Sequence, residues 1–170
     1  MILDGRDGAI GLTYTRTLTF PNVIPPNLLV YVKDQLYIND NSFDKKLNGL
    51  IKQAIFEFER ITGKSVLEQS IVVNYEYFKG KNKLPFEPHI LVTPVTDFTL
   101  SGITSVQYLE GGTGEPLTVT FTAGNEVVPD NITALICLLV GYWFRNEDNV
   151  GMVPSMIYSQ IKAKAVHGWT

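Results

Sequence analysis

The sequence has few of the residues that disulfide, redox or metal chemistry requires. Its 170 residues include one cysteine, Cys137, and two histidines, His89 and His167. A single cysteine cannot form an internal disulfide, and its place in an apolar segment predicts a small buried hydrophobic residue. Neither histidine has a further histidine, cysteine or carboxylate at ligand spacing. We therefore predict no metal site, and we place His89 at the surface or at a strand end.

Positive charge and targeting signals are also scarce. Lys and Arg number 14 against 17 Asp and Glu, which gives a net charge of −3. A clamp on nucleic acid needs a basic surface, so this balance argues against one. The N-terminus lacks the basic-then-apolar order of a signal peptide, and the apolar run at residues 132–144 is shorter than the about 20 residues that span a membrane. We expect an intracellular protein with no membrane partner.

Catalytic motifs are absent from the sequence. It has no nucleophile elbow, no His-x-x-x-His, no Cys-x-x-Cys and no dinucleotide-binding fingerprint. The Gly-rich residues 110–116 lack the lysine and the following helix of a phosphate loop, and residues 4–8 and 38–41 lack the further oxygen ligands of a calcium loop. We predict that the protein is not an enzyme and binds no cofactor. Acid/base chemistry by scattered Asp and Glu side chains stays open as an alternative.

The sequence does contain enough apolar side chain for a folded domain with a large core. At 45% hydrophobic residues it is typical of a globular protein, and a chain of this length buries about 70% of its unfolded surface. The most apolar stretch, residues 129–146, begins with Pro129 and Asp130, which suit the first turn of a helix. A helix that is apolar all round must be buried all round, so we predict a central helix with other elements packed on several sides.

Three more helices are predicted around it. Residues 26–37 repeat apolar side chains every four positions, and Pro154 is placed to open a last helix. The clearest amphipathic helix is capped by Asn41 or Ser42, carries one apolar stripe and ends at Gly63.

The remaining segments predict strands. Ile71, Val73, Tyr75 and Tyr77 alternate along one face, and residues 80–83 read as a basic hairpin turn. Further strands are expected at 89–93, at 103–109 and at 117–122, with 110–116 as a flexible loop in a hairpin. Residues 1–26 are expected to form an N-terminal arm with a strand at 13–20, followed by a single domain at 27–170. The predicted fold class is α+β: a helical bundle around a central buried helix with a small antiparallel sheet packed on it.

Several short strings follow one another in a definite order between Leu28 and Val166. They are the Thr-Gly-Lys helix end in 59–64, the Leu-Pro-Phe-Glu-Pro link at 84–88, the strand at 103–108, the strand-turn-helix passages at 119–124 and 128–132, the Tyr-Trp-Phe-Arg-Asn helix end at 142–146 and the Val-Pro at 153–154. In this order they resemble the head–tail connector proteins of tailed phages, also called head completion or adaptor proteins. The chain departs from that family in a longer N-terminal arm and in an insertion-like stretch at 93–102.

The resemblance implies a structural role in the virion, assembled in the host cytoplasm. It implies a homo-oligomeric ring of about a dozen copies that docks on the portal protein, extends the DNA channel and meets a tail or stopper protein. An acidic protein would let DNA pass without specific binding, because binding strength follows the number of neutralised phosphates. A closed ring uses heterologous contacts, so two different faces of each subunit must match.

Exposure predicts where such contacts lie. The candidate subunit or portal contacts are Thr118 and Thr120 on a strand, and Met156, Tyr158 and Trp169 near the C-terminus. A different class of function stays open as the alternative: a small-ligand-binding module that uses the 110–116 loop and the nearby Tyr75, Tyr77 and Tyr108.

Overall fold

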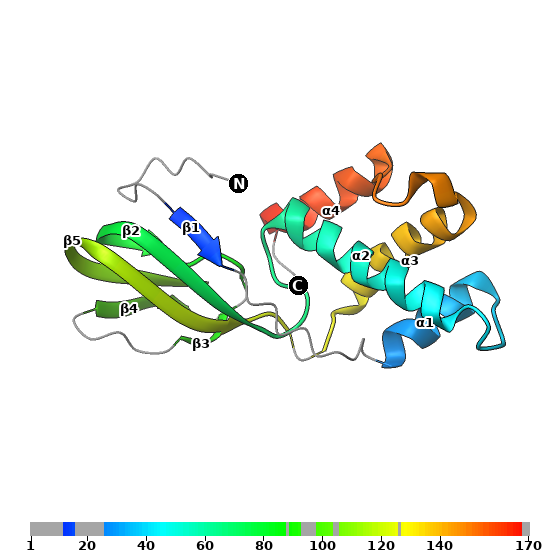
Figure 1. Ribbon diagram of the computed structural model, residues 1–170, viewed down its shortest axis with the longest axis horizontal. Coiled ribbons are helices and arrows are strands. Elements are labelled where there is room, and N and C mark those ends of the chain that lie inside the picture. Colours follow the sequence, from blue (N-terminus) through cyan, green and yellow to red (C-terminus); the bar gives the residue numbers. More distant parts are fainter. Residues whose placement is uncertain are drawn as a thin grey trace. The chain divides into compact units, whose positions relative to one another are not determined.

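The computed structural model describes residues 12–15, 26–87, 89–92, 98–103, 106–125 and 127–167. Its chain forms two compact units, one built from the strands and one from the helices (Figure 1). The predicted α+β class is confirmed. The division into an arm at 1–26 and one domain at 27–170 stays a prediction.

The sheet unit is antiparallel and is centred on two long strands, β2 (Gln69–Lys83) and β5 (Val106–Ala123). The strand order is β1-β2-β5-β3, and β4 also pairs with β5. The shorter strands are β1 (Leu12–Thr15), β3 (His89–Val92) and β4 (Phe98–Ile103). The strand expected at 13–20 begins at Leu12, and Leu12 to Thr15 pair with β2 of the same chain. Residues 16–20 of that prediction lie outside the described residues.

One face of the sheet carries the core of this unit. Ile71, Val73 and Tyr75 of β2 are buried with Val119 and Phe121 of β5, as strand alternation predicts.

The prediction for Tyr77 is wrong. The register of β2 against β5 shifts between Tyr75 and Phe78. A bulge adds one residue to the strand and so reverses which side chains face the core. Phe78 is therefore fully buried, whereas Tyr77 is 38% exposed and its ring fills the space beside Gly114, where a Cβ would lie 2.6 Å from the ring.

Two predicted connections are strands in the structure. Residues 80–83 continue β2 and pair with residues 108–111 of β5, so 80–83 is not a hairpin turn and 110–116 is not a flexible loop. Gly80, Gly111, Gly112 and Gly114 have positive φ, a conformation that glycine adopts at no steric cost, so the ladder continues through its irregularities. The strand predicted at 103–109 is also wrong at its start, because Ile103 is the last residue of β4 and β5 begins at Val106. Strands β4 and β5 form a hairpin, and β4 begins within the stretch at 93–102 that was interpreted as an insertion.

The helical unit contains α1 (Pro26–Leu36), α2 (Asp44–Thr62), α3 (Asp130–Arg145), the 3₁₀ turn η1 (Glu147–Asn149) and α4 (Ser155–His167). All four predicted α-helices are confirmed. Helix α3 contacts α1, α2 and α4. Its indole at Trp143 is fully buried and donates a hydrogen bond of 2.7 Å to the carbonyl oxygen of Met152, which ties the link before α4 to the core.

Helix α2 begins one residue later than a polar cap would place it. Phe43 is the N-cap and makes no side-chain cap hydrogen bond. Ser42 instead donates its hydroxyl and its backbone N–H to Asp40, and these bonds lower the pKa of the Asp40 carboxyl. The predicted cap at Asn41 or Ser42 is therefore wrong. The predicted end is confirmed, because Gly63 has φ of 68° and donates to the Glu59 carbonyl oxygen at 2.8 Å.

Helix α3 is not buried on every side, which corrects the prediction from its composition. Leu138 is 52% exposed, and Ala134, one turn earlier, is also exposed. The neighbouring helices cover the rest of α3, and the side that carries these two residues stays open.

Two glycines should respond to alanine in opposite directions. A Cβ at Gly124, where φ is +117°, would lie 2.0 Å from the carbonyl oxygen of Leu67, whereas a Cβ at the exposed helical Gly49 would meet no atom within 4 Å. Gly124→Ala should lower the free energy of unfolding by about 2–4 kcal/mol, and the matched control Gly49→Ala should raise it by about 0.5–1 kcal/mol. Urea unfolding followed by circular dichroism measures both. An unchanged midpoint for Gly124→Ala would contradict the close approach of the two backbone segments.

Candidate interaction surfaces

Side chains suited to chemistry are not gathered into a reactive cluster in the described part of the chain. Among these residues, no group of three or more His, Cys, Asp and Glu side chains could hold a metal ion. Among the same residues, no helix has the length and apolarity that crossing a bilayer would take.

His89 is at a strand start, as predicted, but it is buried rather than at the surface. Its Nε2 lies 3.0 Å from the carbonyl oxygen of Pro85, and its Nδ1 accepts the backbone N–H of Gln107 at 3.2 Å. An acceptor Nδ1 leaves the proton on Nε2, which can then donate to Pro85. The ring also meets Phe121 edge to face. The imidazole therefore holds two chain segments of the sheet unit together.

Thr118 and Thr120 lie on the exposed face of β5, as predicted. The register places them opposite Asn74 and Val72 of β2, and Thr118 Oγ1 donates to Asn74 Oδ1 at 2.7 Å. Ser70 and Thr122 form the next pair along the same ladder. This stretch of the sheet therefore exposes uncharged side chains, most of which carry hydroxyl groups.

Met156 and Tyr158 are exposed on α4, at 68% and 39% respectively. The helix is held in its unit by Ile157 and Ile161, which are buried on its other side. Met152, just before α4, is 63% exposed, so methionine side chains extend the apolar surface beyond the helix. Trp169, the remaining predicted contact, lies outside the described residues.

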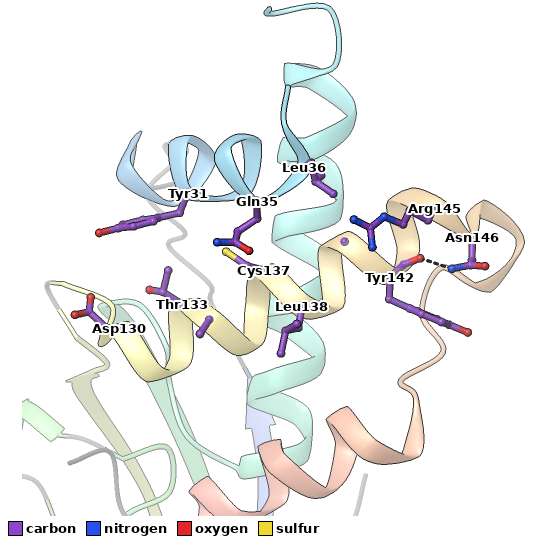
Figure 2. Close-up of a pocket in the computed structure, with 12 residues that line it drawn as sticks. Tyr31, Gln35, Leu36, Asp130, Thr133, Cys137, Leu138, Tyr142, Arg145 and Asn146 are labelled. Atoms are coloured by element: carbon purple, nitrogen blue, oxygen red, sulfur yellow. Dashed lines mark hydrogen bonds between the residues drawn. The ribbon is translucent and has the colours of Figure 1, made fainter. Parts of the chain in front are cut away.

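A groove of about 710 Å³ runs between α1 and α3 within the helical unit (Figure 2). From α1 it is lined by Tyr31, Gln35 and Leu36, and Gln35 projects toward α3. From α3 its lining follows one stripe of the helix, with Ala134, Cys137, Leu138, Gly141 and Tyr142. This is the open side of α3. Helix α3 is about 24 Å long, because it has 16 residues and each adds about 1.5 Å along the helix axis. The groove follows this length of the helix.

The two ends of the groove carry opposite charges. Asp130 lies at the start of α3 and Arg145 at its end, and both line the groove. Each also suits its place, because an acid stabilises a helix N-terminus and a base stabilises a C-terminus. In the described part of the chain neither side chain has an ion-pair partner, so both charges are open to an outside partner.

Aromatic and charged contacts fix the turn that follows this groove. Lys46 of α2 forms an ion pair with Glu147 of η1, and its ammonium lies 4.8 Å from the centre of the Phe144 ring. Phe43 meets the same ring edge to face, at 5.5 Å between centroids. The end of α3 and the start of η1 are thereby held against α2.

The sequence did not identify the groove, because its walls come from helices about 100 residues apart in the chain. The one signal present was the pair of small residues, Ala134 and Gly141, on the same side of α3 as Leu138. A sequence that alternates small and large residues along one helix stripe leaves room for another helix to approach.

The three tyrosines named for the ligand-binding alternative, Tyr75, Tyr77 and Tyr108, do not surround a loop. Tyr75 is buried, Tyr77 covers Gly114, and Tyr108 is half-buried with the Lys81 ammonium 5.2 Å from its ring centre. Because residues 110–116 lie within β5, and Glu110, Gly111 and Glu115 pair with β2, the loop on which that alternative depended is a strand.

Cys137 should be unreactive in the folded protein. It is 9% exposed, and burial raises the pKa of its thiol from 9.0 to about 11. The thiolate is the reactive species, so a shift of this size lowers its fraction at pH 8 by about a hundredfold. Titration with a chromogenic disulfide should show slow labelling in buffer and fast labelling in denaturant. Equal rates in the two conditions would contradict a buried thiol.

Comparison with known proteins shows the fold to be one seen before. No protein-family model matches the sequence, and no curated protein matches it. A chain in "Neck of empty GTA particle computed with C6 symmetry" superposes with a TM-score of 0.68 at 16% identity, over 95% of this chain and 100% of that one. A chain in "Virion of native gene transfer agent (GTA) particle" gives 0.67 at 15%, over 91% and 94%, and one in "Neck of native GTA particle computed with C12 symmetry" gives 0.66 at 14%, over 95% and 100%.

Proposed function

We propose that this protein is a structural subunit of a phage-type head–tail connector. In this role it forms a ring that docks on the portal, extends the DNA channel and joins the head to the tail or a stopper protein. The observation that carries the proposal is the shared fold with neck chains of gene transfer agent particles, which covers 95% of this chain and 100% of the neck chain. The order of connector-like strings between Leu28 and Val166 supports the same proposal from the sequence.

The symmetry of those particles supports the proposed ring. Their necks are described with six-fold and twelve-fold symmetry, and a ring of about a dozen copies is compatible with both. The protein would work in the virion and assemble in the host cytoplasm. Its function would be mechanical, without catalysis or a cofactor.

The surfaces of the described residues suit assembly. Each unit presents a distinct exposed surface: the hydroxyl-rich face with Thr118 and Thr120, and the apolar surface with Met156 and Tyr158. Trp169 is proposed as a further contact from its sequence position alone. Exposed methionine and aromatic side chains are enriched where proteins meet partners, and a net charge of −3 gives passing DNA little to bind.

Association with the portal protein of the same genome tests the proposal. Light scattering of the mixture should give a mass that exceeds the portal alone by about a dozen subunits, and electron microscopy should show an added ring. The chain alone and the portal alone are the controls. A mixture that behaves as the sum of its two parts would count against the connector role.

The hydroxyl-rich face can be tested by one residue. Thr120→Glu places a charge on a face where Thr118, Asn74 and Val72 carry none, so it should weaken portal association if this face is a contact. Thr120→Ser is the matched control, because it keeps the hydroxyl and adds no charge. A drop in bound subunits for Thr120→Glu, with an unchanged unfolding midpoint, assigns the loss to the surface. Equal association of both variants would place the contact elsewhere.

A further inference from the structure

We propose that the groove between α1 and α3 of one subunit receives the exposed face of α4 from a second copy of the chain. This proposal rests on the ring function above and names its head-to-tail contact. The groove and α4 are different surfaces of the same unit, which is what a heterologous contact between identical subunits requires.

The groove has the dimensions and chemistry of a helix receptor. It follows about 24 Å of α3, and Leu138 stands in it 52% exposed. Gly141 has no side chain to fill the groove, and a Cβ at this position would meet only the Leu36 side chain, at 3.7 Å. Helices that present an apolar face to such a groove are a recurring mode of recognition.

The exposed face of α4 is shaped to enter it. Met156, Ser159 and Ala163 follow one another at i, i+3 and i+7 and therefore share one face, opposite the buried Ile157 and Ile161. Ser159 and Ala163 are small, so the helix backbone can come close to α3. Met156 is unbranched and adapts to an irregular apolar surface such as the one around Leu138.

Charge gives the contact its direction. The groove has Arg145 at one end and Asp130 at the other. The segment that would occupy it begins with Asp148 in η1, continues through Met152 and Met156, and carries Lys162 farther along α4. With Asp148 near Arg145 and Lys162 near Asp130, both ends are complementary, whereas the reversed direction would bring like charges together, which costs affinity and excludes wrong arrangements.

The contact is one part of a ring interface. A standard interface uses about 20–30 residues from each partner, and 12 residues line the groove. The contact is therefore expected to be weak between two free subunits and to persist when further contacts, such as those to the portal, hold the ring together.

Cysteine cross-linking tests the geometry. In a Leu138→Cys/Met156→Cys double variant, every copy carries one introduced cysteine in its groove and one on α4. Oxidation at high protein concentration, and again with portal present, should give a ladder of dimers, trimers and larger species on a non-reducing gel. An equimolar mixture of the two single variants should stop at dimers. The natural Cys137 is buried and is expected to contribute little.

Val127 supplies the matched control for the cross-link. It is 69% exposed against 68% for Met156, so a Leu138→Cys/Val127→Cys variant has equally accessible thiols in a pairing that the proposal does not predict. A ladder for the first variant and not for this control supports the contact. No ladder under either condition, or the same ladder for both variants, overturns it.

A charge exchange between copies tests the direction. The Arg145→Glu variant alone places a negative charge opposite Asp148 of the next copy. The Asp148→Arg variant alone places a positive charge opposite Arg145 of the next copy. Each variant should therefore associate about tenfold more weakly than the unchanged chain. Mixed in equal amounts they should associate normally, because every contact in an alternating assembly is then complementary. The restoration occurs between copies, so an ion pair within one chain cannot explain it. A mixture as weak as its components overturns the assignment.

These outcomes separate the contact from the connector role. If subunits add to the portal but neither the ladder nor the charge rescue is seen, the ring uses other faces and the connector role stands. If the ladder and the rescue are seen but no subunits add to the portal, the contact between copies stands and the connector role fails.

Discussion

The helical unit depends on the burial of α3. Its large apolar side chains, among them Ile132, Ile136, Leu139 and Trp143, are buried almost completely, and each is worth about 1.5–3 kcal/mol when it leaves water. Helices α1, α2 and α4 are all packed on it. The same arrangement leaves one stripe of α3 uncovered, and that stripe is the floor of the groove. The stability of the unit and its open apolar surface therefore have one origin.

Local signals predicted the helices well. The period of 3.6, the glycine at 63 and the prolines at 129 and 154 mark helix faces and ends within a few neighbouring residues, so they act without tertiary context. Where another hydrogen bond within the same turn competed, the cap signal failed. The cap expected at Ser42 was not formed, because that hydroxyl bonds Asp40 instead, and Asp44 of the first turn pairs with Lys33 at 2.8 Å.

The sheet was harder to predict because its pairing is long-range. Glycines at 80, 111, 112 and 114 look like loop residues when read alone, yet β2 and β5 remain paired through them. The bulge after Tyr75 exchanges the positions of Tyr77 and Phe78 relative to the core, and alternation along one strand cannot reveal it. Of the candidate contacts, Thr118, Thr120, Met156 and Tyr158 are exposed as expected. The groove could not be predicted from the sequence, because its two walls come together only in the folded chain.

An assembly subunit has to leave apolar surface uncovered without aggregating. Here the uncovered residues are split between a concave groove and a convex helix face, so neither surface fits itself and two copies cannot close into a symmetric pair through either one alone. In the proposed contact, the charges at Asp130 and Arg145 would restrict how the two surfaces can meet. In this proposed contact, each chain of copies keeps one groove and one α4 face free at its ends, so growth would continue until a ring closed. The same apolar chemistry that folds the subunit would in this way also define its place among its copies.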